Sequence, residues 1–564
     1  MQYIKTCCFF LFLSSLSSSA FSQSTYLAPG DKQAYILSRM EILMGKDSIL
    51  NFSKNQPLNR QKYIVAALPS IEAFQENNDP SEADKYNLRS LYLNNQEFLS
   101  SEQREDFKSK KPFWKKLFTS PANLFETHSK DFDLVINPLL SFQLSKEKDN
   151  DANLFLNSRG ISIRGKIANR VGFYTSLVEN QERAAGYVQE WITEREAVPG
   201  VGNYKEYRDA GGTDYFDARG YITFTAAKYI DIAFGYDNQF IGNGYRSLFL
   251  NNTGSSNLFL KLNTRIWKFN YQNLFMELHN ADRRTGDKLL GKKYAAMHHL
   301  DMAVAKWLNI GLFEGIVFNR PNRFDFSYLN PIIFYRSVEF QNGSPDNAIA
   351  GLDAKANLFG KVQLYGQLLL DEFKLKELTA KDGWWANKWA IQMGAKYINV
   401  AGIKNLDLQV EHNIVRPFTY SHTDSIANYT HYNQPLGHQL MANLKEWIII
   451  GRYQPIPKLT LMGKLIYYKQ GQDVANSNFG SNIFLPNKPS NRNGDYGYFI
   501  GDGHTTKVLN FQGLASYEVL QNLFVDVNMV ARREKTTVTP IYDNKTFIMS
   551  LGVRWNLQHR YFDF

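Results

Sequence analysis

The chain of 564 residues lacks sequence features that several classes of protein require. Its only two cysteines are Cys7 and Cys8, so the rest of the chain can form neither a disulfide nor a thiolate metal site. After the N-terminus, no stretch has the roughly 18 uninterrupted apolar residues that a membrane-spanning helix requires, and mean hydropathy is −0.38. A helical membrane protein is therefore excluded. If the chain crosses a membrane, it does so as strands.

The first 22 residues have the features of a cleaved secretory signal. Lys5 supplies the positive region, residues 9–13 the apolar centre, and Ala20-Phe21-Ser22 a small-x-small cleavage site. The alternative is a buried N-terminal helix, which these flanks do not favour. We therefore expect an exported protein whose mature chain begins at Gln23.

The formal net charge is +10, of which Lys5 accounts for one unit. A basic balance suggests acidic partners. An exported protein does not meet nucleic acid. The remaining explanations are the phosphates of lipopolysaccharide, acidic surface glycans, or simply a solvated lumen and loops.

Residues 23–130 differ in sequence pattern from the rest and predict a small helical domain. Helices are expected after Pro29, around residues 63–71 and after Pro80, each with apolar residues at helical spacing. Because this domain precedes the first strand, we expect it to lie in the periplasm or to block the mouth of a barrel. The aromatic and basic segment 113–118 that follows is typical of a membrane surface, or of a plain linker helix.

Residues 131–564 alternate apolar and polar side chains over short segments, which is typical of an outer-membrane β-barrel. In the last segment Phe547 and Met549 share a face fit for lipid, while Ser550 and Gly552 share the other. A soluble sandwich can show the same pattern in one strand, so the repetition carries the prediction.

We expect an all-β transmembrane barrel of about 18 antiparallel strands, an even number. The expected strands are residues 131–143, 154–166, 169–180, 215–227, 229–240, 257–268, 269–280, 294–306, 308–318, 350–359, 361–372, 388–400, 404–414, 438–453, 457–469, 505–517, 521–533 and 545–557.

The connections alternate between tight and long. Tight links are expected at residues 168, 229, 307–308, 360, 401–403, 454–456 and 519–521, and long ones at 181–214, 241–256, 281–293, 319–349, 373–387, 415–437, 470–504 and 534–544. Tight links would face the periplasm and long loops the cell exterior, which is the asymmetry of outer-membrane barrels. A barrel of this width can also hold a water-filled lumen, so a diffusion porin or specific channel is the main alternative function.

The chain ends on Tyr561-Phe562-Asp563-Phe564, a few residues past the last expected strand. Outer-membrane barrels commonly carry an aromatic C-terminal signal for assembly, and this ending fits. A terminal phenylalanine also occurs by chance, so it adds little alone.

Two stretches are more specific than a barrel requires. They read GYDNQFIGNGYRSLFL at residues 235–250, and FSYLNPIIFYRSVEF at 326–340 with GSPDNA at 343–348 and GLD at 351–353. Together they resemble the Wzi family of capsule-assembly outer-membrane proteins, and within it the RemB type of gliding-motility surface protein of Bacteroidetes.

The resemblance covers most of the barrel and extends through LYGQ at residues 364–367 and DEF at 371–373. It implies an 18-stranded barrel with a periplasmic helical part. This number agrees with the strand count made above without the resemblance. For Wzi proper it implies attachment of capsular polysaccharide to the cell surface. For the RemB type it implies a surface role in gliding, with gliding or secretion machinery as a possible partner.

The Gly242-x-Gly244 segment is not a phosphate-binding loop, because no helix of a βαβ unit follows it. We expect these glycines to let the chain fold back into the barrel mouth. Arg246 would then form a lumenal ion pair with Glu339 or Asp353, or meet an acidic glycan, and the ion pair is favoured.

Histidines at positions 298, 299, 412, 422, 431 and 438 are the tempting catalytic residues. None has the i, i+4 spacing with a neighbouring glutamate that a zinc protease shows. No local motif suggests a Ser-His hydrolase either. We therefore expect no enzymatic activity, no cofactor and no metal.

The aromatic and basic residues of the external loops are better candidates, for glycan recognition. Aromatic rings would stack on sugars while arginines hold acidic substituents. The alternative is that Trp384 and Trp385 belong to the outer aromatic girdle, which lies at the level of the lipid headgroups. The predicted contacts are Arg246, Arg320, Arg323, Arg336, Trp384, Trp385, Arg416 and Tyr420. Expected partners are outer-membrane lipid or lipopolysaccharide and a surface polysaccharide.

Overall fold

The computed structural model describes residues 25–27, 30–45, 58–110, 113–114, 116–168, 170–207, 211–280, 289–320, 323–332, 334–474, 477–537 and 542–564. The predicted signal segment 1–22 lies outside these residues. Within the described ranges, no helix has both the length and the hydropathy needed to span a bilayer.

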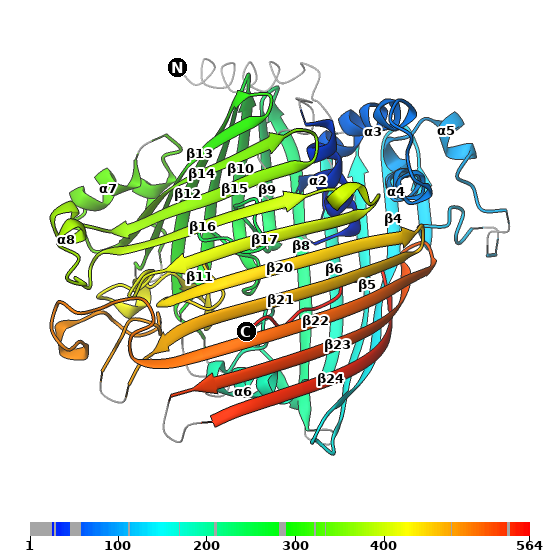
Figure 1. Ribbon diagram of the computed structural model, residues 1–564. Coiled ribbons are helices and arrows are strands. Elements are labelled where there is room, and N and C mark those ends of the chain that lie inside the picture. The colour runs from blue at the N-terminus through cyan, green and yellow to red at the C-terminus, as the bar shows by residue number, and fades with distance from the viewer. Residues whose placement is uncertain are drawn as a thin grey trace, which may run out of the picture.

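Eighteen antiparallel strands close into a barrel, which confirms the predicted fold (Figure 1). They are β4 (Phe132–Glu147), β5 (Asn153–Ile167), β6 (Val171–Arg183), β8 (Gly212–Ala227), β9 (Ile230–Asp237), β10 (Asn257–Ile266), β11 (Phe269–His279), β12 (Lys292–Ala305), β13 (Leu308–Phe318), β14 (Asn347–Leu358), β15 (Val362–Glu372), β16 (Lys388–Tyr397), β17 (Leu406–Val415), β20 (Leu444–Ile456), β21 (Leu459–Gln472), β22 (His504–Leu520), β23 (Leu523–Thr536) and β24 (Tyr542–Trp555). The ring closes between β24 and β4, where Ser550 lies opposite Ser145. Closure leaves the wall without an open edge, as a strand-built membrane span requires. The short strand β3 (Phe125–His128) pairs with β4, and the short strand β7 (Lys205–Tyr207) pairs with β8.

The alternation in the sequence becomes the two faces of this wall. On β24, Phe547, Met549 and Leu551 point outward and are 39, 43 and 60% exposed. Ile548 and Ser550 point inward and are buried. The tight links and the long loops occupy opposite ends of the barrel, here named the turn end and the loop end.

The three predicted helices are present at the turn end (Figure 1). They are α2 (Lys32–Met44), α3 (Arg60–Glu76) and α4 (Glu82–Leu93), followed by η2 (Gln96–Phe98) and the short α5 (Ser101–Glu105). A two-stranded sheet, β1 (Tyr26–Leu27) with β2 (Leu58–Asn59), accompanies them. Asp31 caps α2, and Ser81 with Asp84 forms a capping box on α4, so at each start a side chain bonds one of the free helix N–H groups.

Buried ion pairs join these helices to the barrel. Glu41 of α2 accepts a hydrogen bond from Lys355 of β14 at 2.7 Å, with both side chains at most 2% exposed. Arg39 bridges Asp407 of β17 at 3.1 Å and Asp84 of α4 at 2.8 Å. The helices therefore lie against the turn end of the barrel.

The described residues of segment 113–118 form no helix, so the linker-helix interpretation is wrong for them. Leu117 N–H donates to the Phe113 carbonyl at 2.8 Å, and the two residues form an isolated β-bridge, with Trp114 in a turn. Trp114 is 76% exposed and Phe113 is 55% exposed, so the turn presents aromatic surface.

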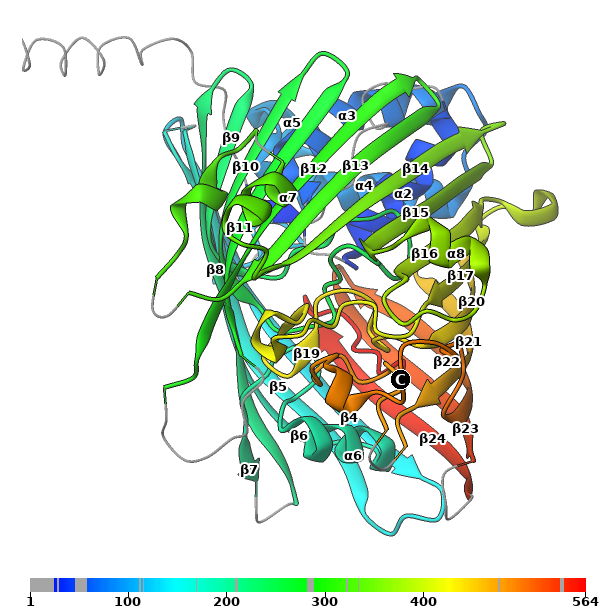
Figure 2. The same cartoon turned by 90° about the vertical axis from the view of Figure 1, so that its left-hand side faces the viewer.

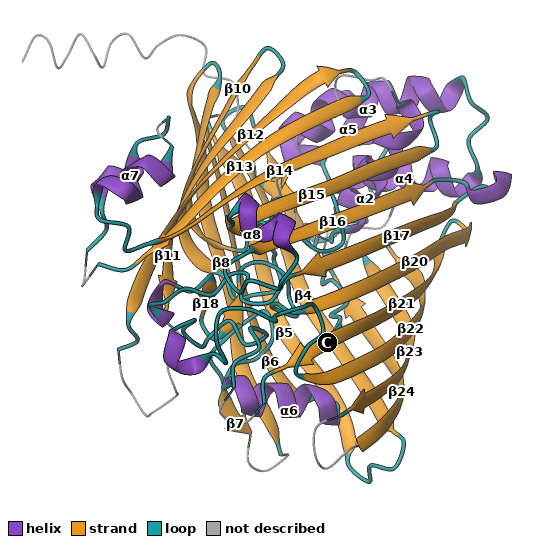
Figure 3. Ribbon diagram, turned by 60° about the vertical axis from the view of Figure 1, so that its left-hand side comes forward, coloured by secondary structure: helices purple, strands orange, loops and turns teal. Residues whose placement is uncertain are grey.

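The long loops carry the remaining short elements (Figure 3). These are α6 (Gly186–Arg195), η4 (Phe326–Leu329), α7 (Tyr335–Gln341), α8 (Leu375–Ala380), η6 (Ser425–Ala427), β18 (Thr430–His431), β19 (Gln434–Pro435) and η7 (Pro489–Asn491), while η5 (Val400–Gly402) lies in a turn. The chain does not end on the wall: after β24 its tail, residues 556–564, enters the ring of strands (Figure 2). There Phe564 accepts a hydrogen bond from Arg532 Nε at 3.0 Å and stacks on Trp191 of α6 at 5.3 Å.

Candidate functional site

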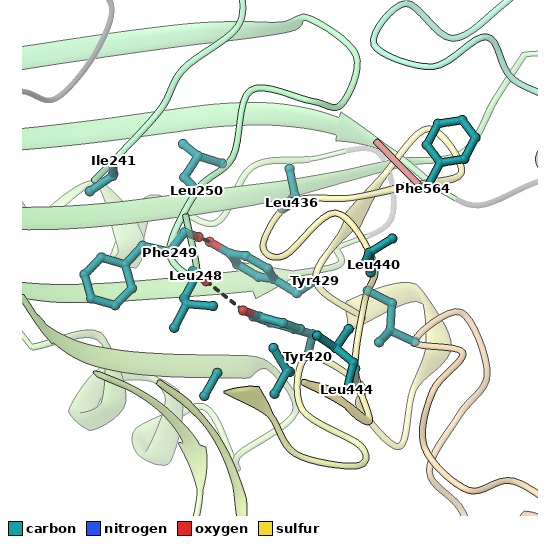
Figure 4. Close-up of a cluster of buried hydrophobic side chains, with 14 of the residues drawn as sticks. Ile241, Leu248, Phe249, Leu250, Tyr420, Tyr429, Leu436, Leu440, Leu444 and Phe564 are labelled. Carbon is teal, nitrogen blue, oxygen red and sulfur yellow. Dashed lines mark hydrogen bonds between the residues drawn. The ribbon is translucent and has the colours of Figure 1, made fainter. Parts of the chain in front are cut away.

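Segments from distant parts of the chain pack together inside the barrel (Figure 4). They are loop 238–256, residues 420–443 of the loop between β17 and β20, and the tail 556–564, here called the lumenal plug. The Tyr420 hydroxyl donates to the Leu248 carbonyl at 2.9 Å, and the Tyr429 hydroxyl to the Phe249 carbonyl at 2.5 Å. The two tyrosine rings stack at 5.7 Å and are fully buried. Aromatic side chains of one loop therefore hold the backbone of another within the lumen.

Residues of strands β13, β14 and β15 pack against loop 238–256 and bond to it. Phe249 stacks face to face on Phe313 of β13, with ring centroids 4.5 Å apart. A Cβ at Gly351 of β14 would lie 2.3 Å from the Phe249 ring, so only glycine leaves room there. Gln367 of β15 accepts from Leu248 N–H at 2.8 Å and donates to the Ile241 carbonyl at 3.0 Å. Residues quoted for the family resemblance thus meet one another inside the barrel.

Arg246 forms the predicted lumenal ion pair, but with other partners. Its guanidinium bonds Glu446 of β20 at 2.9 Å, and lies 3.7 Å from the Asp563 carboxylate of the tail. The expected partners Glu339 and Asp353 are elsewhere: Glu339 pairs with Arg336 at 3.1 Å, and Asp353 with His299 at 2.6 Å. The prediction was wrong because partners across a barrel depend on how far each loop reaches.

Gly244 allows the loop to pass close to a carboxylate. The N–H groups of Tyr245 and Arg246 donate to Glu411 of β17 at 2.6 and 3.0 Å, and a Cβ at Gly244 would lie 2.5 Å from that carboxylate. The loop does fold back into the barrel, and the missing side chain at Gly244 leaves room for this carboxylate. Burial alone would lower the pKa of Arg246, but Glu446 and Asp563 raise it above its ordinary value, so the plug holds a permanent cation.

A second cluster lies at the loop end, where loops 373–387, 416–443 and 473–503 meet. Trp385 N–H donates to the Asp495 carbonyl, and Tyr498 N–H to the Gly383 carbonyl, both at 2.9 Å. The Arg492 guanidinium lies 3.7 Å from the centroid of the Trp385 ring, a cation–π contact. Phe418 of loop 416–443 packs edge-on against Tyr498 at 5.0 Å, so three otherwise separate loops form one surface.

Arg416 lies beneath this surface without a carboxylate. Its Nη2 donates to the backbone carbonyls of Tyr498 at 2.9 Å and Trp384 at 3.4 Å. Its Nε is buried and has no partner among the described residues. Burial lowers its pKa, and no acidic neighbour in the described part of the chain offsets that effect. The site therefore offers an uncompensated cation beside half-buried tryptophans.

The structure brings together only some of the predicted ligand contacts. Trp384, Trp385 and Arg416 share the loop-end cluster, with Trp385 packed edge-on against Phe418 at 5.9 Å and not out in a lipid girdle. Arg246 and Tyr420 are buried in the lumenal plug and are closed to a ligand there. Arg320, Arg323 and Arg336 belong to loop 319–346, which lies on the outer wall as described below.

Other members of the loop-end cluster were missed from the sequence. They are Phe418, Arg492, Asp495, Tyr496, Tyr498 and Phe499, of which Tyr496 and Phe499 are 53 and 50% exposed. The sequence RNGDYGYFIGDG at residues 492–503, where aromatic residues alternate with glycines, was the available signal. Glycines permit tight turns and so bring aromatic rings to one surface.

The histidines have structural partners. His438 bonds Glu446 at 2.9 Å, and His431 bonds the Ser256 carbonyl at 3.0 Å. In the described ranges, no group of three histidine, cysteine or acidic side chains lies in a position to hold a metal ion.

No protein-family model and no curated protein matches this sequence. The fold is similar to that of Wzi. Wzi is an outer-membrane protein involved in group 1 capsule assembly in Escherichia coli and is a carbohydrate-binding β-barrel; it is 13% identical over 96% of this chain and 100% of its own, with a TM-score of 0.56. Two further barrels are OprD of Pseudomonas aeruginosa, 12% identical over 75% of this chain and 94% of its own with a TM-score of 0.40, and OccAB2 of Acinetobacter baumannii, 10% identical over 75% and 98% with a TM-score of 0.42. At such identities the likeness shows the fold alone.

Proposed function

We propose that the protein is a non-enzymatic outer-membrane barrel that binds an acidic surface polysaccharide at its loop end and so retains it on the cell. The carrying observation is Arg416, a cation without a carboxylate partner beneath the tryptophans of the loop-end cluster. A carboxylate or phosphate on a sugar would supply the missing partner.

The neighbouring side chains suit the rest of such a ligand. Tyr496 is 53% exposed and so is open to stacking on a sugar, while the half-buried Trp384 and Trp385 carry Lys374 and Arg492 over their rings at 4.6 and 3.7 Å. Arg492 is held in place by Asp495 at 2.6 Å and by the Trp385 ring. Aromatic faces combined with fixed cations match the chemistry of an acidic glycan. The likeness of the fold to the carbohydrate-binding Wzi barrel agrees with this proposal.

The lumenal plug disfavours the alternative of a diffusion porin. Loop 238–256 crosses the interior and bonds to strands β15, β17 and β20 opposite its own. We therefore assign retention of polysaccharide, and not diffusion, to this barrel. A role in gliding rests on the sequence resemblance alone and is tested separately.

The experiment compares cells with the wild-type gene, without it, and with Arg416→Gln, by staining cell-attached and shed polysaccharide. We expect the deletion and the variant to shift polysaccharide from cells to medium. Arg533→Gln is the matched control, since Arg533 is an exposed arginine of β23 already paired with Asp543 at 2.6 Å. Unchanged retention in the deletion strain would contradict the proposal. A gliding assay on the same strains tests the motility role.

A further inference from the structure

The described residues of loop 319–346 lie on the outer wall of the barrel and are called the strap from here on; they are 319–320, 323–332 and 334–346. Phe313 faces the lumen because it stacks on Phe249, so alternation along β13 places Glu314, Ile316 and Phe318 on the outward face. Tyr328 of the strap packs on Phe318 with ring centroids 4.7 Å apart. Figures 2 and 3 show α7 of the strap outside the wall, beside β11 to β13.

The strap covers a row of polar side chains on that outward face. Asn273, His298 and Glu314 lie opposite one another on β11, β12 and β13. Arg336 N–H at the start of α7 donates to Glu314 at 3.0 Å, and the Tyr335 ring lies 4.0 Å from the His298 ring. Polar groups that are exposed to lipid on the outer wall raise the free energy of the folded protein. These contacts therefore stabilise the strap in its position on the wall.

Both ends of the strap are fixed. Arg320 makes two bonds to Asp346, each of 2.7 Å, and the Tyr328 hydroxyl donates to the same carboxylate at 2.7 Å. The Tyr271 hydroxyl of β11 donates to the Pro331 carbonyl at 2.6 Å. The strap is therefore a built part of the wall.

The outer surface of the strap is strongly apolar. Phe326, Ile332, Phe334 and Phe340 are 80, 82, 77 and 71% exposed. They continue the lipid-facing surface of the bare wall, where Leu352 of β14 is 45% exposed. Large apolar groups this exposed in water would be unfavourable, whereas lipid surrounds this face of a barrel.

Two cations accompany these apolar groups. Arg323 is exposed, and the Arg336 side chain is 65% exposed although it also pairs with the buried Glu339. Apolar and basic groups together on a surface element are the pattern of binding to anionic lipid at an interface. We infer that the strap inserts its apolar side chains into the surrounding lipid and holds the acidic headgroup of a lipid with Arg323 and Arg336. This inference is independent of the glycan proposal, because it concerns the outer wall and not the loop-end cluster.

Insertion is tested with a fluorescent bimane label on single-cysteine variants, with Cys7 and Cys8 replaced by serine. The proteins are placed in nanodiscs of phosphatidylcholine and phosphatidylglycerol whose acyl chains carry a nitroxide quencher. We expect a label on Phe340→Cys to be quenched as strongly as one on Leu352→Cys of the wall, and far more than one on Tyr496→Cys at the loop end. A label on Phe340→Cys that reaches water, or that is shielded without lipid quenching as by a second copy or another protein, would overturn the inference.

Headgroup selectivity is tested with the same label while the nitroxide is carried either by phosphatidylglycerol or by phosphatidylcholine. We expect Arg323→Gln and Arg336→Gln each to lower the preference for the acidic lipid by about five-fold, in line with one lost cation near an anionic surface. Arg159→Gln is the control, since Arg159 is an exposed cation on β5 paired with Glu179 at 3.2 Å. An unchanged preference in both strap variants would overturn the role given to the arginines.

Discussion

The lumenal plug contains the buried Arg246 and the loop-end cluster the half-buried Arg416, and the two arginines differ in their partners. Arg246 in the plug has Glu446 at 2.9 Å and Asp563 at 3.7 Å. Arg416 at the loop end bonds only backbone carbonyls within the described structure. A buried charge is stable when it is paired and costly when it is not. The first arrangement therefore serves the fold, whereas the second is the one to which our proposal assigns a ligand.

Removing Arg246 should have the largest effect. The variant Arg246→Ala leaves Glu446 and Asp563 buried without this cation, at a cost of about 3–5 kcal/mol to the packed plug. We expect a lower thermal unfolding temperature and new conductance steps in planar bilayers. Arg533→Ala, which breaks an exposed pair, is the control. Unchanged stability and conductance would mean that Arg246 does not hold the plug.

Replacing Arg416 should weaken binding and spare the fold. A lost charge-assisted bond of about 1.5–3 kcal/mol corresponds to roughly a ten- to hundred-fold loss of affinity. We expect Arg416→Gln to show this loss for purified acidic polysaccharide, with dextran as the neutral control. Its thermal stability should equal or exceed that of the wild type, because an uncompensated buried charge has gone. A drop in stability as large as that of Arg246→Ala would instead make Arg416 a structural residue.

Filling the space at Gly351 tests how the plug is seated. The Cβ of Gly351→Ala would lie 2.3 Å from the Phe249 ring, and overpacking of this kind costs about 1–3 kcal/mol. We expect a lower thermal unfolding temperature and partial recovery in the double variant Gly351→Ala with Phe249→Leu. Additive losses in that double variant would show that the two residues do not compete for the same space.

The smallest expected effect is a pH dependence of loop 416–443. His431 accepts from His279 N–H and bonds the Ser256 carbonyl, each at 3.0 Å, and burial lowers its pKa to about 3. Since the unfolded pKa is about 6.5, its contribution is complete above that pH and declines as the pH falls toward the folded value. Hydrogen exchange of this loop, corrected for intrinsic rates, should be faster at pH 4.5 than at pH 7.5. The variant His431→Gln, which keeps a donor and an acceptor, should lose that difference, and an equal difference in both proteins would exclude His431.

The strands could be predicted from the sequence, because side-chain alternation is a local property of each strand and the wall turns it directly into two faces. Even Ile548, an apolar residue at a lumen-facing position, fits, since it is buried in the same hydrophobic cluster as Leu248 and Phe564 of the plug. The partners of Arg246 could not be predicted from the local sequence pattern. Glu446 and Asp563 are distant from Arg246 in sequence, and the paths of loop 238–256 and of the tail determine that they meet. The strap shows the same limit: its length predicts a loop, but nothing in it indicates that Tyr335 folds back over the outer wall.

Planar-bilayer recording of the purified wild-type protein tests the central claim most directly, namely that the lumen is closed by the plug and that the loop end carries the function. The account predicts no stable large conductance. Stable large conductance in the wild-type protein would contradict it and would favour a diffusion pore.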